Sequence, residues 1–174
     1  MISEPVSIQP AVSLRRGSDV AAGVALIALP FVTAIVKVIA PGWLMVFYVF
    51  GLVVFLPLFA LVIVIAATGF FSRRAAFAFV GAGRIRAQIA AWLHPLAFLA
   101  ATAVLRDAAD DGRWASPLSV VLGTEDSSFI TAADTLFTPL ATISVLALIW
   151  LTVEWIRALI ARKQFAAQSI EPRR

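Results

Sequence analysis

The sequence predicts an all-α, multi-pass integral membrane protein whose four transmembrane helices form a bundle. Hydrophobic residues make up 61% of its 174 residues and charged residues 14%, whereas a typical soluble domain is about 45–50% apolar and about 25% charged. So small a chain cannot bury this apolar surface in its own interior, because small domains bury the smallest fraction of their surface. Four long uncharged stretches, and the positions of the charges between them, complete the prediction.

The first half of the chain contains two predicted spans behind a polar tail, residues 1–19. Residues 20–40 carry one charge, Lys37, whose long stem is expected to reach the membrane surface. A cleaved signal peptide is the alternative, although this apolar stretch is longer than the usual ~7–15 residues. After a Pro-Gly turn, residues 43–71 carry no charge and exceed the ~20 that cross the hydrocarbon core. This second span is therefore expected to tilt, to kink at Pro57 or to project beyond the bilayer.

The second half contains a third span, residues 87–105, and a fourth, residues 135–156. A glycine-rich segment, residues 81–83, precedes the third span and is expected to act as a hinge. The third span is rich in alanine, with pairs of small residues four positions apart that let helix backbones approach closely. We therefore expect it to be the span most enclosed by the others. The membrane domain covers residues 20–160, and a basic tail, residues 161–174, follows it.

The charges are sorted between the two ends of the predicted helices. Six of the ten acidic residues lie in the loop between the third and fourth spans, residues 106–134. Eleven of the fourteen basic residues lie in residues 15–16, 73–86 and 157–174. Basic flanks belong in the cytoplasm, so both termini are expected to be cytoplasmic and the acidic loop to lie outside. This pattern predicts a multi-pass protein of a bacterial cytoplasmic (inner) membrane.

Four residues are candidates for a polar proton or ligand site within the membrane: His94, Glu154, Arg157 and Lys37. An ionisable side chain at membrane depth is a functional candidate by default. His94 is the only histidine of the chain, and it could exchange a proton with Glu154 if the third and fourth spans pack together. The alternative is structural, with His94 bonded to a neighbouring helix and Glu154 paired with Arg157, three residues on along the same helix.

The outer loop is a candidate cation-binding site through Asp107, Asp110 and Asp111, since hard cations bind clustered oxygens. The spacing does not match a calcium-binding loop, and a solvated acidic surface is the other interpretation. The chain has no cysteine, which excludes thiolate chemistry and cysteine zinc sites. We expect no metal and no cofactor, with a tetrapyrrole bound through His94 as the remaining alternative. Nucleic acid is not an expected partner, because the basic residues flank apolar runs.

These features favour a non-enzymatic role, because no catalytic constellation is present. We expect a small structural, accessory or assembly subunit of a larger membrane complex, in contact with membrane lipids. The alanine-rich third span and the outer loop are the expected contacts with other membrane-protein subunits. Two alternatives remain open. One is a small oligomeric transporter or channel that uses His94 and Glu154, and the other is a lipid-modifying membrane enzyme with a divalent ion at the acidic outer loop.

Overall fold

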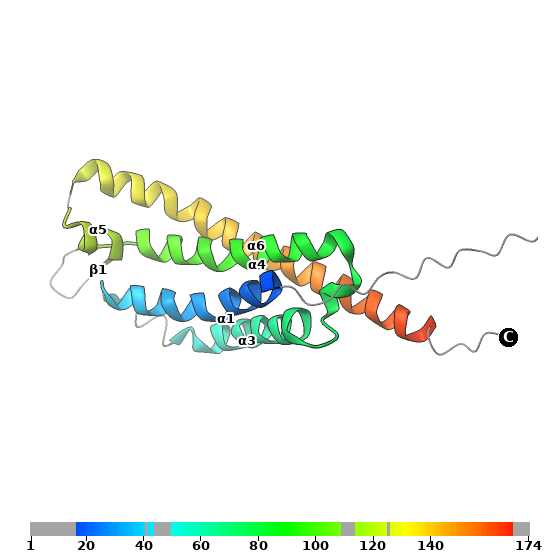
Figure 1. The fold of residues 1–174 in the computed structure, drawn as a ribbon. Helices are drawn as coiled ribbons and strands as arrows, with labels where there is room; N and C mark the ends of the chain where they lie inside the picture. Colours follow the sequence, from blue (N-terminus) through cyan, green and yellow to red (C-terminus); the bar gives the residue numbers. More distant parts are fainter. Residues whose placement is uncertain (1–16, 41, 44–49, 109–113, 125, 169–174) are drawn as a thin grey trace, which may run out of the picture.

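The computed structural model describes residues 17–40, 42–43, 50–108, 114–124 and 126–168. These residues are mostly helical (Figure 1). The helices long and apolar enough to cross a membrane are, among the described residues, α1 (Gly17–Val38), α3 (Leu52–Ile65) with its continuation η1 (Ala66–Phe71), α4 (Gly81–Val104) and α6 (Ser127–Gln168). The shorter elements are η2 (Ala76–Phe79), β1 (Asp107–Ala108), β2 (Trp114–Ala115) and α5 (Pro117–Leu122). The predicted helical fold with four candidate spans is therefore confirmed.

The alanine-rich α4 is the central helix and lies between α6 and α1 (Figure 1). Small side chains on α4 let the neighbouring backbones come close, and several of them are buried: Ala87, Ala90, Ala91, Ala97 and Ala101. In the most apolar part of α4, 44% of the residues are buried, against 33% in α1 and 17% in α6. The expectation that the third span is the most enclosed is confirmed.

Two ion pairs show that α1 and α4 run in the same direction. Asp19, in the first turn of α1, pairs with Arg84, near the start of α4. Lys37, in the last turn of α1, pairs with Asp107, which follows the end of α4. We refer to the two ends of the packed helices as the Asp19 end and the Asp107 end. The connecting α3 and the long α6 run in the opposite direction (Figure 1).

Phenylalanines at the Asp19 end fill the space between α1, η1 and η2. The end of α3 widens into the π-helical turn η1, in which Phe70 is fully buried. Its ring lies 4.8 Å from the ring of Phe77 in η2. Glycines make these contacts possible: an added Cβ at Gly23 of α1 would lie 2.8 Å from the ring of Phe71, and one at Gly69 would lie 2.5 Å from the ring of Phe77. Close packing against phenylalanine rings therefore requires glycine at both positions.

Substitution of Gly69 by alanine is expected to destabilise the protein by about 1–3 kcal/mol, the usual effect of overpacking a core. Phe77 is 1% exposed and its ring packs against Phe70, so an added methyl group at position 69 is expected to strain this contact. The control is Gly81→Ala, where an added Cβ meets nothing within 4 Å. Thermal unfolding in mild detergent measures both. Equal midpoints for the two variants would contradict the close packing of Gly69 against Phe77.

The ends of two helices differ from the predicted boundaries. α4 begins at Gly81, so the glycine-rich segment is the first turn of the helix and the predicted hinge is wrong. α6 covers 42 residues, about 63 Å, and extends well beyond the other helices at the Asp19 end (Figure 1). It begins at Ser127 because the carboxylate of Asp126 accepts a hydrogen bond from the backbone N–H of Ser128 at 3.0 Å, as an N-cap does. The end of the predicted outer loop is thus helical.

The rest of the predicted outer loop is partly folded on the Asp107 end of the helices. Two short strands, β1 and β2, pair antiparallel, with Asp107 opposite Ala115. Ser116 caps α5 through a capping box with Ser119, and Gly123 ends α5 in the left-handed conformation, with a φ of 61°. α5 buries Pro117 and leaves Val121 and Leu122 exposed. An apolar face therefore remains uncovered at this end.

Candidate functional site

Polar side chains link α4 to its two neighbours at several levels, and the first link joins α4 to α1 at the Asp19 end. The Nε atom of Arg84 donates to Oδ1 of Asp19 at 2.9 Å, and its Nη2 atom donates to Oδ2, so the pair is bidentate. Gln88, one turn further along α4, donates to the same Oδ1 at 2.7 Å. Both charged side chains are more than 90% buried. Sequence reasoning missed this pair, although Arg84 and Gln88 are four residues apart and so share one helix face.

The second link is the ion pair of Lys37 with Asp107 at the Asp107 end. The Nζ atom lies 3.0 Å from Oδ2 of Asp107, and the two side chains are 1% and 3% exposed. The side chain of Lys37 is therefore turned into the protein, and it does not extend into solvent as the stem of a snorkelling lysine does. The chain around Gly42 packs directly on Asp107, because an added Cβ there would overlap the carboxylate. The ammonium group stays buried because it meets its counter-charge inside the protein.

His94 lies in the middle of α4 and faces α6. Its Nδ1 atom is 3.0 Å from the hydroxyl oxygen of Ser144 and 3.0 Å from the backbone oxygen of the same residue. The ring also stacks on Phe98, one turn along α4, at 6.5 Å between centroids. The contact with a neighbouring helix is the one that the structural interpretation of His94 predicts.

Glu154 forms the third ion-pair link, between α6 and α4. Its side chain is 3% exposed, and Oε1 lies 2.9 Å from Nε of Arg86 and 3.5 Å from Nη1 of Arg157. Trp150 adds a hydrogen bond from its indole N–H at 3.4 Å. The contact between Glu154 and Arg157 is the expected one, whereas the closer partner, Arg86, lies just before the predicted third span, residues 87–105.

His94 and Glu154 do not share a partner. Ser144, which contacts His94, and Glu154 are ten residues apart on α6, which corresponds to about 15 Å along a helix. Lys37 lies at the opposite end from Glu154. The four intramembrane candidates therefore belong to three separate contacts, and the packing of α4 on α6 does not bring His94 and Glu154 into one proton-transfer pair.

No protein-family model matches the chain, and no curated protein or solved structure is significantly similar to it.

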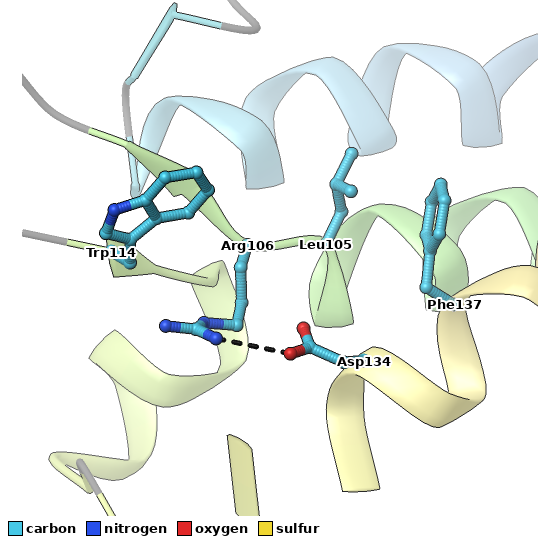
Figure 2. A pocket seen from close by; sticks show the side chains of 5 residues that line it. All are labelled: Leu105, Arg106, Trp114, Asp134 and Phe137. Carbon is cyan, nitrogen blue, oxygen red and sulfur yellow. Dashed lines mark hydrogen bonds and ion pairs between the residues drawn. The ribbon is translucent and has the colours of Figure 1, made fainter. Parts of the chain in front are cut away.

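Two adjoining cavities lie at the Asp107 end, between the short strands, α5 and the start of α6. The smaller, about 190 Å³, is lined by Leu105, Arg106, Trp114, Asp134 and Phe137. Figure 2 shows the guanidinium of Arg106 turned towards Asp134, with 3.2 Å between Nη1 and Oδ2. The same guanidinium lies 5.9 Å from the Trp114 ring. The larger, about 710 Å³, shares Arg106 and Trp114 and continues along α5.

The acidic side chains of the outer loop do not form a described cation site. Asp110 and Asp111 lie outside the described residues, and Asp107 pairs with Lys37. Within the described ranges, no group of three or more metal-ligating side chains is present. The Asp107 carboxylate therefore contributes to holding the helices together through its ion pair with Lys37, which does not involve Asp110 or Asp111.

Proposed function

We propose that this chain is a structural or accessory subunit of a larger membrane complex, with its long helices in the bilayer as a bundle. The observation that carries the proposal concerns the buried charges of the described residues. There are five of them: Asp19, Lys37, Arg84, Asp107 and Glu154. Each lies in an ion pair that joins α4, or the strand after it, to α1 or α6. Charged side chains that are paired in this way hold the helices in place. They are therefore less suited to catalysis or ion transport, which need charged groups that can bind a substrate or an ion.

The spacing of the ion pairs supports a transmembrane placement. Asp19 and Lys37 are eighteen residues apart on α1, which corresponds to about 27 Å along a helix. The hydrocarbon core of a bilayer is about 30 Å thick. The two pairs that join α1 to α4 therefore suit the two membrane surfaces, where buried charges are least unfavourable.

The distribution of charge between the two ends of the helices supports the orientation in an inner membrane. Seven basic residues lie at the Asp19 end: Arg73, Arg74, Arg84, Arg86, Arg157, Arg162 and Lys163. The acidic Asp107, Asp126 and Asp134 lie at the opposite end. Since basic flanks belong in the cytoplasm, we place the Asp19 end and both termini there.

The exposed apolar face of α6 supports the proposal that another protein packs against this chain. α6 is the least buried of the four long helices. Its exposed apolar side chains follow one another along the helix: Val145, Leu146, Ile149, Val153, Ile156 and Ile160. Because α6 is about twice the length needed to span the bilayer, it offers a partner a continuous surface from the membrane into the cytoplasm.

Photo-crosslinking in the native membrane tests this proposal. A photoreactive residue at Ile149, which is 54% exposed, is expected to give a discrete protein adduct of higher mass. The same residue at Val53 of α3, which is 81% exposed, is the control for a face that meets lipid. Only diffuse lipid adducts at both positions, together with a monomer in mild detergent, would contradict the proposal.

The alternative functions have less support. A transporter that uses His94 and Glu154 needs a polar path between them, and each of these side chains has its own partner on a neighbouring helix. A lipid-modifying enzyme with a divalent ion at the outer loop has to work without a free Asp107 carboxylate.

A further inference from the structure

Two exposed arginines flank the buried carboxylate of Glu154 at the Asp19 end. Arg86 on α4 is 49% exposed and Arg157 on α6 is 64% exposed, whereas Glu154 is 3% exposed. Two positive charges face one negative charge, so the group carries a net charge of about +1 that is directed outward. We infer that Arg86 and Arg157 bind the headgroup phosphate of an anionic phospholipid at the seam between α4 and α6.

Glu154 positions both arginines for this role. Oε1 of Glu154 lies 2.9 Å from Nε of Arg86, and Arg86 also donates from Nη2 to Oε2 at 3.4 Å. Arg157 directs its Nη1 atom to Oε1 at 3.5 Å. A guanidinium has five N–H donors, so each arginine retains donors on its exposed side. The planar fork of arginine matches the geometry of a phosphate, and two forks held by one carboxylate form a preorganised clamp.

The surface on the membrane side of the clamp is apolar. On α4, Ile89 and Leu93 lie three and seven residues after Arg86, and so on the same helix face; they are 51% and 39% exposed. On α6, Trp150 lies seven residues before Arg157 and is 37% exposed. An acyl chain can lie along this track while the phosphate meets the arginines. Free phosphate lacks such a chain, and for this reason we assign a lipid.

The level of the clamp along the helices agrees with a headgroup. Arg86 is two residues from Arg84, whose pair with Asp19 lies about 27 Å from the Lys37–Asp107 pair. This separation is close to the thickness of the hydrocarbon core, so the clamp lies at one bilayer surface. The inference is independent of whether the chain serves as a subunit of a complex.

Native mass spectrometry of the full-length protein in mild detergent, titrated with phosphatidylglycerol, tests the inference. Arg157→Gln is expected to weaken binding at least about fivefold, the effect of one basic residue near an anionic surface. This variant leaves Arg86 to neutralise Glu154, so the fold is expected to persist. Lys163→Gln removes the same charge from the same helix, but about 9 Å further out and on another face. That distance is about one screening length, so a change below about twofold is expected for it.

Four results would overturn the inference. Equal losses for Arg157→Gln and Lys163→Gln would indicate diffuse attraction to the whole basic end. Equal binding of phosphatidylcholine would show that the negative charge is not recognised. Displacement of the lipid by millimolar inorganic phosphate would show that the site recognises phosphate without the acyl chains. Arg157→Lys separates charge from geometry, because it keeps the charge and loses the fork; unchanged affinity in this variant would contradict the clamp. Unfolding midpoints of all variants are measured in the same detergent, and only folded variants are compared.

Discussion

Replacement of Arg84 by methionine is expected to lower the free energy of unfolding by about 3 kcal/mol, at the lower end of the range for breaking a buried ion pair. The substitution leaves the carboxylate of Asp19 buried without its bidentate partner. Gln88 still donates to Asp19, which keeps the effect from being larger. Denaturant titration in mixed micelles, followed by circular dichroism, measures the change.

The double variant Asp19→Leu/Arg84→Met is the decisive control. Removal of both members leaves no uncompensated charge, and Gln88 keeps Ser18 as an acceptor, so the stability is expected to stay within about 1 kcal/mol of the wild type. Arg73→Met removes an exposed arginine at the same end and is expected to change stability by less than about 0.5 kcal/mol. If the double variant were as unstable as Arg84→Met alone, the ion pair would not be the source of the loss.

Replacement of Asp107 by alanine is expected to have an effect of similar size, about 3–5 kcal/mol, because it leaves the buried ammonium of Lys37 without a counter-charge. The loss is expected to be the same in the presence of a chelator and of millimolar Mg²⁺ or Ca²⁺. An ion pair requires no cation, whereas a cation site at the outer loop would make the stability of the wild type depend on the metal. Thermal unfolding under the three conditions measures both effects.

The matched control at the same end is Asp134→Asn. Asp134 pairs with Arg106 at 3.2 Å, but its side chain is 55% exposed, so the loss is expected to be below about 1 kcal/mol. A wild-type unfolding midpoint that rises with Mg²⁺ or Ca²⁺, and no longer does so in Asp107→Ala, would favour a cation at Asp107 over the ion pair.

Hydropathy predicted which segments form the long apolar helices, but it predicted the first and last residues of these helices poorly. The uncharged runs are visible without any tertiary information, because about 20 apolar residues must follow one another to cross a bilayer. In the sequence, charged residues mark the predicted ends of the spans. α4 instead includes Arg84 and Arg86, and α6 continues through Arg157, Arg162 and Lys163. Helix formation does not stop where lipid gives way to water, so the boundaries depended on caps such as Asp126 rather than on charge.

The contacts of the candidate site residues also fall into two groups, those that the sequence predicted and those that it did not. Glu154 and Arg157 are three residues apart, and a local rule predicted their contact. The partners of Lys37, His94 and Glu154 on other helices lie 50 to 70 residues away, where no spacing rule applies. The sequence alone therefore predicts a snorkelling Lys37 and a cation site at Asp107, whereas in the structure these two side chains pair with each other. Spacing does not predict the pair of Asp19 and Arg84 either, because the two residues are 65 positions apart.

The sequence by itself determined that the chain is helical and that four segments can enter a membrane, because these properties depend on runs of neighbouring residues. Its alanines also determined which helix is the most enclosed, since only small side chains let three backbones pack closely. Only the tertiary structure decided which charges meet. In the structure, α1 packs parallel to α4, and α6 packs antiparallel to α4 on the other side. This arrangement brings charged residues from Asp19 to Glu154 together as matched pairs. Burial of a single charge is strongly unfavourable, whereas burial of an ion pair is tolerated. Each of these charged residues is therefore buried only where its partner on another element lies beside it.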